Sequence, residues 1–180
     1  MVNPLLFKYM LTPLDYSIVK FTTFADTSAV AQVRDLAESV HFEKGAVIES
    51  RGKPTDHIYL IDEGMVQLGV KGVDGSQFNL ARLGPGHTFG ESEIFLNLNV
   101  IHDATAESDV VVQKLSRANV DQLKTSSLSF SKALMAVSCI KVQTMLTYIG
   151  DTLGMPLLAR VAQQTLSVSE GVDNTDLVHL

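Results

Sequence analysis

The fold is decided by a glycine-rich stretch, residues 83–95, which reads LGPGHTFGESEIF. The Pro85-Gly86 pair favours a turn, and Phe89-Gly90-Glu91 leads into a segment that could form one helical turn. A glycine lets a ligand approach the backbone, free amides at the start of a helix can hold an anion, and a following carboxylate can accept from sugar hydroxyls. The residues alone leave a second interpretation open, a glycine-rich barrel corner without a ligand.

The surrounding region, about residues 44–120, has the pattern of a β-rich domain. Nine of the twelve glycines lie between Gly45 and Gly90, where they separate short runs rich in Val, Ile, Leu, Phe and Tyr. The predicted strands are 46–49, 57–61, 65–70, 77–81 and 110–115. Asp74-Gly75 is a good tight-turn pair between two of them. Many short strands with glycine at the corners predict a β-barrel or jelly roll.

Helical patterns precede and follow this region. Before it, Asp26-Thr27-Ser28 offers helix N-caps, and apolar residues follow at helical spacing as far as Val40. After it, a long helix is predicted from about residue 126 to 149, with N-cap candidates at Ser126 and Ser127. This helix is expected to break at Gly150 and at Gly154-Met155-Pro156. A shorter helix is then expected over residues 157–166.

The long predicted helix is apolar on one side, and that side needs a partner surface. A neighbouring chain packed in coiled-coil fashion is one solution, and the chain's own barrel is the other. We expect a homodimer. The expected interface residues are Phe130, Leu134, Val137, Lys141, Met145 and Tyr148.

Composition and charge narrow the classes of function. The 180 residues contain 20 acidic and 14 basic side chains, a net charge of −6, with no basic cluster for DNA phosphates. The single cysteine, Cys139, excludes a disulfide framework within one chain, and its place in an apolar helix favours a core residue. The first residues lack a signal-peptide pattern, and no apolar run approaches the length of a membrane span. We expect a soluble cytoplasmic protein that does not contact membranes.

An ordered series of residues across the β-rich region resembles the cyclic-nucleotide-binding domain, and in particular the sensor half of Crp/Fnr transcription regulators. The series consists of Phe42, Lys44-Gly45, Ile48, Gly52, Ile58-Tyr59-Leu60-Ile61, Gly64, Val66, Gly75, Leu83-Gly84-Pro85-Gly86, Phe89-Gly90-Glu91 and Ala104-Thr105-Ala106. The resemblance implies a mainly β fold with added helices. It would be a jelly roll (double-stranded β-helix) with N-terminal helices and a long C-terminal dimerisation helix.

The resemblance also implies a phosphate-binding cassette in this chain. Its expected ligand-binding residues are Phe89, Gly90, Glu91, Ser92, His102, Asp103, Ala104 and Thr105, and Glu91 holds the position that accepts the ribose hydroxyl. The chain departs from the family pattern at His102, which stands where an arginine should hold the phosphate. The loop before His102 is also about one residue longer than usual. An arginine binds a phosphate bidentately, so we expect a small nucleotide-like effector other than cyclic AMP. A cassette that binds no ligand stays open as the alternative.

The predicted organisation has three parts: a sensor domain over 1–124, a dimerisation helix over 125–150, and a helix and linker over 151–180. The chain stops in an apolar segment at Leu180, after which we expect a DNA-binding helix-turn-helix domain. The predicted function is effector-controlled transcription regulation without enzymatic activity and with no identified cofactor. The effector, the DNA target and the direction of regulation are left open.

Two alternatives remain at this point. One is a stand-alone binding module of the same fold that does not act on DNA. The other is a cupin-type metal-binding protein, because His87, Glu91 and His102 partly match the cupin ligand set of histidines and a glutamate. Zinc and other transition metals need several convergent ligands, and the paired His-x-His of cupins is missing, so no metal site is predicted.

Overall fold

The computed structural model describes residues 19–71 and 77–154. Its helices are α2 (Phe21–Phe24), α3 (Thr27–Leu36), α4 (Glu91–Leu96), α5 (Arg117–Ser126) and α6 (Leu128–Gly154). Its strands are β1 (Glu38–Phe42), β2 (Val47–Glu49), β3 (His57–Glu63), β4 (Val66–Lys71), β5 (Gln77–Leu83), β6 (Thr88–Phe89), β7 (Asp103–Ala106) and β8 (Val110–Ser116).

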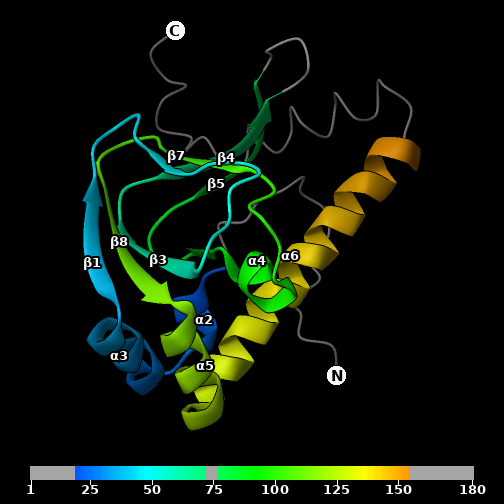
Figure 1. The fold of residues 1–180 in the computed structure, drawn as a ribbon. Helices are drawn as coiled ribbons and strands as arrows, with labels where there is room; N and C mark the ends of the chain where they lie inside the picture. The colour runs from blue at the N-terminus through cyan, green and yellow to red at the C-terminus, as the bar shows by residue number, and fades with distance from the viewer. Residues whose placement is uncertain (1–18, 72–76, 155–180) are drawn as a thin grey trace, which may run out of the picture. The chain divides into compact units, whose positions relative to one another are not determined.

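The strands form two four-stranded antiparallel sheets, in the orders β1-β8-β3-β6 and β2-β7-β4-β5 (Figure 1). Strand β3 pairs with β8 over most of its length, with Tyr59 opposite Lys114. In the other sheet β4 lies between β5 and β7, with Leu68 opposite Ala104. Buried side chains of β3, β4 and β8 fill the space between the sheets, including Ile61, Val66 and Val112. This is the predicted jelly roll.

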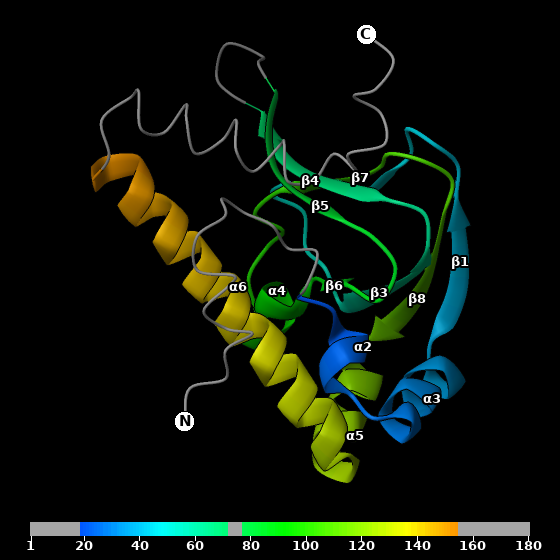
Figure 2. The same cartoon turned by 180° about the vertical axis from the view of Figure 1, so that it is seen from behind.

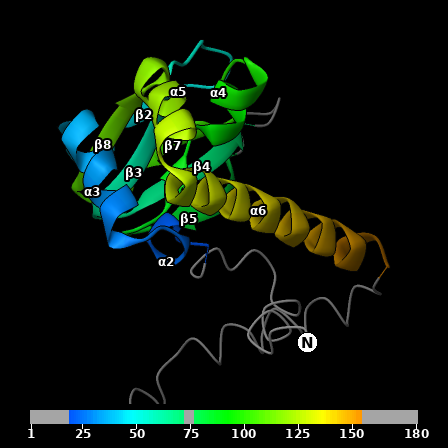
Figure 3. The same cartoon turned by 90° about the horizontal axis from the view of Figure 1, so that it is seen from below.

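Helices α3 and α5 lie side by side next to strand β8 (Figure 3). Asp26 begins α3, and its carboxylate accepts a hydrogen bond from the amide of Ala29 at 2.8 Å, which confirms the predicted N-cap. The helix ends at Leu36, so the predicted continuation to Val40 is wrong: Val40 lies in β1, opposite Val112. Helix α5 was not predicted.

Helix α6 begins after Ser127, whose hydroxyl accepts from the amide of Phe130 at 3.4 Å. It continues through Gly150 to Gly154, so the predicted break at Gly150 is wrong. The predicted turn at residues 74–75 and the predicted helix over 157–166 lie outside the described residues.

The contacts of the chain divide it into two units, and the boundary lies inside α6. One unit is Tyr16–Lys141; the other combines Met1–Asp15 with Val142–Leu180. The first unit contains both sheets and every described element up to Lys141. Figure 2 shows its two sheets from behind. The predicted boundary at 124/125 falls inside α5.

Candidate functional site

The candidate cassette begins where β6 turns into α4, and a glycine is required at this turn. Gly90 has a φ of +92°, in the left-handed region that side chains rarely adopt. A Cβ atom on Gly90 would lie 2.6 Å from the carbonyl oxygen of His57 on β3. The tight approach of these two segments places Glu91 inside the domain at the first position of α4, where its side chain is buried.

Both carboxylate oxygens of Glu91 accept hydrogen bonds from side chains of the same chain. The hydroxyl of Thr88 donates to its Oε1 atom. Nζ of Lys141, on α6, lies 2.9 Å from Oε1 and 3.0 Å from Oε2, and it also donates to the carbonyl of Thr88 at 2.7 Å. Burial alone would raise the pKa of Glu91, but the charge of Lys141 and these hydrogen bonds outweigh it and lower the pKa. Glu91 is therefore an ionised carboxylate paired with an ammonium.

A second acidic side chain of α4, Glu93, faces His102, the residue at which the resemblance leads us to expect an arginine. Glu93 Oε1 and His102 Nδ1 lie 3.8 Å apart, and both atoms are buried without a hydrogen-bond partner among the described residues. The other oxygen, Oε2, accepts from the hydroxyl of Ser92 at 2.8 Å. Burial lowers the pKa of His102, and the charge of Lys141 adds to this, although Glu93 and the other nearby acids oppose it. His102 therefore favours its neutral form.

The remaining cassette residues are distributed over β6, α4 and β7. The ring of Phe89 is buried and stacks on Tyr59, with 4.7 Å between centroids. Oδ1 of Asp103 accepts from the backbone amide of Arg51 at 2.9 Å. Ala104 is fully buried in β7, and Thr105 follows it opposite Gln67 of β4.

Sequence reasoning assigned Lys141 to a dimer interface and missed its contact with the cassette. A signal was present in the sequence: Lys141 is the only charged residue of the long helix between Lys132 and Asp151. A single lysine in an apolar helix needs either water or an acidic partner. Only the structure shows which acid it reaches.

The predicted dimer-interface residues divide into two groups. Phe130, Leu134 and Val137 are buried by the chain's own domain, so the expectation that they face a partner is wrong. Lys141 is engaged by Glu91, whereas Met145 is exposed and Tyr148 is partly exposed. Over residues 128–150 of α6, the exposed large apolar side chains include Met145 from the predicted set and five others: Leu128, Met135, Val142, Leu146 and Ile149.

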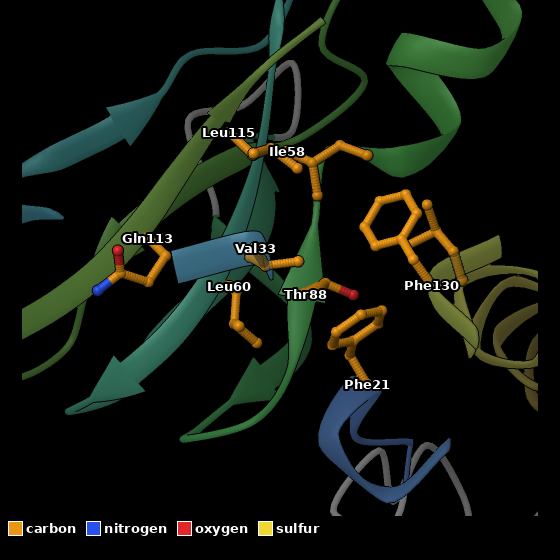
Figure 4. Close-up of a pocket in the computed structure, with 9 residues that line it drawn as sticks. Phe21, Val33, Ile58, Leu60, Thr88, Gln113, Leu115 and Phe130 are labelled. Atoms are coloured by element: carbon orange, nitrogen blue, oxygen red, sulfur yellow. The ribbon is translucent and has the colours of Figure 1, made fainter. Parts of the chain in front are cut away.

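Cys139 is exposed, which corrects the expectation that it belongs to the core. The core contacts of α6 come from the opposite side of the helix. The ring of Phe130 meets that of Phe21 edge-on, with centroids 5.8 Å apart (Figure 4). These two rings, with Leu134, lie among the residues that line a cavity of about 10 Å³. This volume is about the minimum that a single water molecule needs. The cavity is therefore a gap in the packing and is too small for an effector.

A wider open groove, about 560 Å³, lies beside the loop between α4 and β7. Arg51, Gly52 and residues 97–101 line it.

Among the described residues, no group of three or more His, Cys, Asp or Glu side chains is arranged to hold a metal ion. The ring of His87 is buried, with Nδ1 2.8 Å from the carbonyl oxygen of Gly84. The faint cupin-like set of His87, Glu91 and His102 is therefore not assembled as a metal centre.

One helix of the described residues, Leu128–Gly150, is long and apolar enough to cross a membrane, with a mean hydropathy of 1.3. The expectation that no apolar segment reaches this length therefore needs correction. Length and composition are weak evidence for a span, because core helices share them. The first half of this helix packs its buried side, including Phe130 and Leu134, on the domain.

Comparison with known proteins agrees with this geometry. The sequence pattern of the family described as "Cyclic nucleotide-binding domain" matches residues 39–127. Over 145 residues the chain is 26% identical to the CRP-like cAMP-activated global transcriptional regulator of Mycobacterium tuberculosis, covering 81% of this chain and 65% of that relative. A shorter match, 32% identical over 73 residues, links it to the potassium channel GORK of Arabidopsis thaliana, covering 41% of this chain and 9% of the channel.

Solved structures share the fold. The catabolite activator protein of Thermus thermophilus has a TM-score of 0.61 at 21% identity, covering 81% of this chain and 60% of that one. The c-di-GMP responsive regulator CLP of Xanthomonas campestris has a TM-score of 0.67 at 16% identity, covering 81% and 73%. Residues 39–127 thus carry the sequence pattern of the cyclic nucleotide-binding domain, in a chain that is similar over 145 residues to a CRP-like transcriptional regulator.

Proposed function

We propose that this chain is the sensor and dimerisation part of a Crp/Fnr-like transcription regulator. A small effector bound at the cassette controls DNA binding, and that effector is not cyclic AMP. Homology to the mycobacterial regulator supports the general role. The chain spans 65% of that relative's length, so the control of DNA binding by this chain is proposed and does not follow from the similarity alone. The protein acts in the cytoplasm and catalyses no reaction.

The observation that carries the proposal is the occupied state of Glu91. The resemblance gives this carboxylate the task of accepting a ribose hydroxyl, and here Lys141 and Thr88 already donate to it. His102 favours its neutral form where an arginine would hold a cyclic phosphate. Of the described residues, those whose charges act on His102 are Glu93, Lys141, Glu91 and Asp103, which is three acids and one base. A phosphate at this place would meet net negative charge.

The same chain offers a dimerisation surface on α6, although not the one that the sequence suggested. Leu128, Met135, Val142 and Ile149 are exposed and follow one another at intervals of seven residues. Such a heptad repeat is the pattern with which two helices pack as a coiled coil. A homodimer joined along this stripe would bring the two copies of α6 together, and an effector could then change how the pair packs.

The effector proposal is tested by thermal unfolding of the chain with cyclic AMP, cyclic GMP or cyclic di-GMP, each at 1 mM. A ligand with a Kd of 10 μM would stabilise the folded state by about 2.7 kcal/mol at that concentration. For a chain of this size, the midpoint would rise by roughly 5–10 °C. We expect cyclic AMP to cause no such rise. A rise of that size with cyclic AMP would overturn the proposed effector class.

The isolated chain is also expected to bind DNA weakly and without sequence preference, because its charge is −6 and no basic cluster is present in its sequence. A gel-shift assay with competitor DNA measures this. A specific complex that survives competition would contradict the proposal that this part of the regulator senses and dimerises but does not itself recognise a DNA sequence.

A further inference from the structure

We propose that Lys141 is a specificity-determining residue of the cassette, which excludes cyclic nucleotides by occupying the carboxylate of Glu91. This inference rests on the proposed function and deepens it. The chain has two separate barriers to a cyclic nucleotide: a neutral histidine at the phosphate end, and an internal ion pair at the ribose end.

The geometry of Lys141 supports complete occupation of its ammonium group. A lysine ammonium has three N–H donors. Three acceptors surround Nζ, the carbonyl oxygen of Thr88 at 2.7 Å and the two oxygens of Glu91 at 2.9 and 3.0 Å. The Thr88 hydroxyl adds a further bond to Glu91 Oε1. An ammonium with all three donors matched at short distances, two of them by a carboxylate, resists displacement.

A ribose is a poor competitor for this carboxylate. Its hydroxyls are neutral donors, so their bond to the carboxylate would carry charge on the acceptor alone, whereas the bond from Lys141 joins two opposite charges at 2.9 Å. The Glu91 side chain is only 7% exposed and that of Lys141 is 21% exposed. An ammonium displaced from this place would leave a partly buried charge without its partner. The ion pair therefore favours the empty cassette over the nucleotide-bound one.

The two barriers predict a result that neither alone would give. Replacing His102 by arginine restores the charge at the phosphate end but leaves Glu91 occupied by Lys141. Removing the lysine frees Glu91 but leaves the phosphate without a cation. Both changes together are required for cyclic AMP to bind.

The experiment measures cyclic AMP binding by calorimetry at pH 7 with the wild type, His102→Arg, Lys141→Ala and the double variant His102→Arg/Lys141→Ala. The matched control is His102→Arg/Lys132→Ala, because Lys132 is an exposed lysine on the same helix, nine residues earlier. A triple variant that adds Glu91→Gln tests whether the freed carboxylate holds the ligand. Circular dichroism and the unfolding midpoint establish that each variant is folded, and Lys141→Gln replaces Lys141→Ala if the alanine variant does not fold.

We expect the double variant to bind cyclic AMP at least tenfold more tightly than either single variant and than the control, and the triple variant to lose that gain. The inference is overturned if His102→Arg alone binds as tightly as the double variant, or if a folded double variant shows no gain. Tight binding by the wild type would overturn both this inference and the proposed effector class, whereas the two preceding outcomes would overturn this inference alone.

Discussion

Lys141 and Glu91 are fifty residues apart in the sequence, and their side chains form a partly buried ion pair of 2.9 Å that joins helix α6 to the cassette. The pair belongs to the unit Tyr16–Lys141, in which α6 also contributes Phe130, Leu134 and Val137 to the core. The cassette and the first half of the long helix are thus connected through both apolar packing and one charged contact.

The first prediction concerns the strength of this connection. Lys141→Met leaves Glu91 buried without its partner, and we expect a loss of about 3 kcal/mol in the free energy of unfolding at pH 7. Glu91→Gln leaves an ammonium that can reach water, so its loss should be smaller, about 1 kcal/mol. Urea unfolding of the two single variants and the double variant measures the coupling between the residues. We expect the double variant to lose less than the sum, by about 1–3 kcal/mol; additive losses would show that the pair contributes little.

The first half of α6 illustrates what periodicity can and cannot predict. Phe130, Leu134, Val137 and Lys141 lie on one face of the helix, as their spacing indicates. Spacing identifies a shared face but does not say which surface covers it. The chain's own domain buries the three apolar residues, and only the three-dimensional arrangement of β6, α4 and α6 shows that Lys141 meets Glu91.

The errors near the ends of elements have similar physical causes. Val40 fits a helical repeat with Val33 and Leu36, but the chain leaves the helix at Ala37 and Val40 then pairs with Val112 in a sheet. Long-range pairing of this kind leaves no local signal. Helix α5 buries only Val120 and Leu123, too few apolar residues for a recognisable stripe. Strands β2, β3, β4, β5 and β8 and the start of α4 were predictable, because short apolar runs and glycine turns are local features.

The second prediction concerns the pH dependence of stability. Burial lowers the pKa of His102 in the folded chain, with a further contribution from Lys141, so below about pH 6.5, the usual value, the unfolded chain binds a proton more readily. Stability should therefore fall as the pH drops below about 6.5, until the pH passes the folded pKa. The slope is at most about 1.4 kcal/mol per pH unit for one proton.

His102→Gln should reduce this slope, measured by urea unfolding between pH 7 and 5. The pKa of His57 is also lowered, again mainly by burial, so part of the slope should remain and should decrease further in His57→Gln/His102→Gln. An unchanged slope in the double variant would contradict the assignment of the slope to these two histidines.

The pKa of Glu91 is lowered as well. Its contribution is present above about pH 4.3, the usual value for glutamate, and is lost only as the pH falls through the folded pKa, below this window.

The third prediction compares two glycines in opposite situations. Gly90→Ala forces a side chain into a left-handed conformation, and its Cβ would meet the His57 carbonyl oxygen at 2.6 Å. We expect a loss of at least about 2 kcal/mol in the free energy of unfolding. Gly150 lies inside α6 with nothing within 4 Å of an added Cβ, so Gly150→Ala should stabilise its helix by roughly 0.5–1 kcal/mol. Equal effects of the two substitutions on thermal unfolding would show that the turn at Gly90 is not under this constraint.

The fourth prediction tests the dimerisation surface on α6. Met135 and Val142 are exposed members of the seven-residue repeat, so changing both to glutamate should disrupt a coiled coil while leaving each domain folded. Leu134 is the matched contrast, since it is one residue from Met135 but only 1% exposed. Leu134→Glu places a charge in the core and should unfold the domain or destabilise it by several kcal/mol.

Sedimentation at about 10–100 μM, a range that detects even weak apolar association, distinguishes these outcomes. We expect a dimer for the wild type and a folded monomer for Met135→Glu/Val142→Glu, with an unchanged unfolding midpoint for the jelly roll once dissociation is taken into account. A wild-type monomer throughout this range would contradict dimerisation by this chain. A dimer that persists in the double variant would place the interface elsewhere, because two charges in a heptad seam cannot be buried against a second copy without a large loss of affinity.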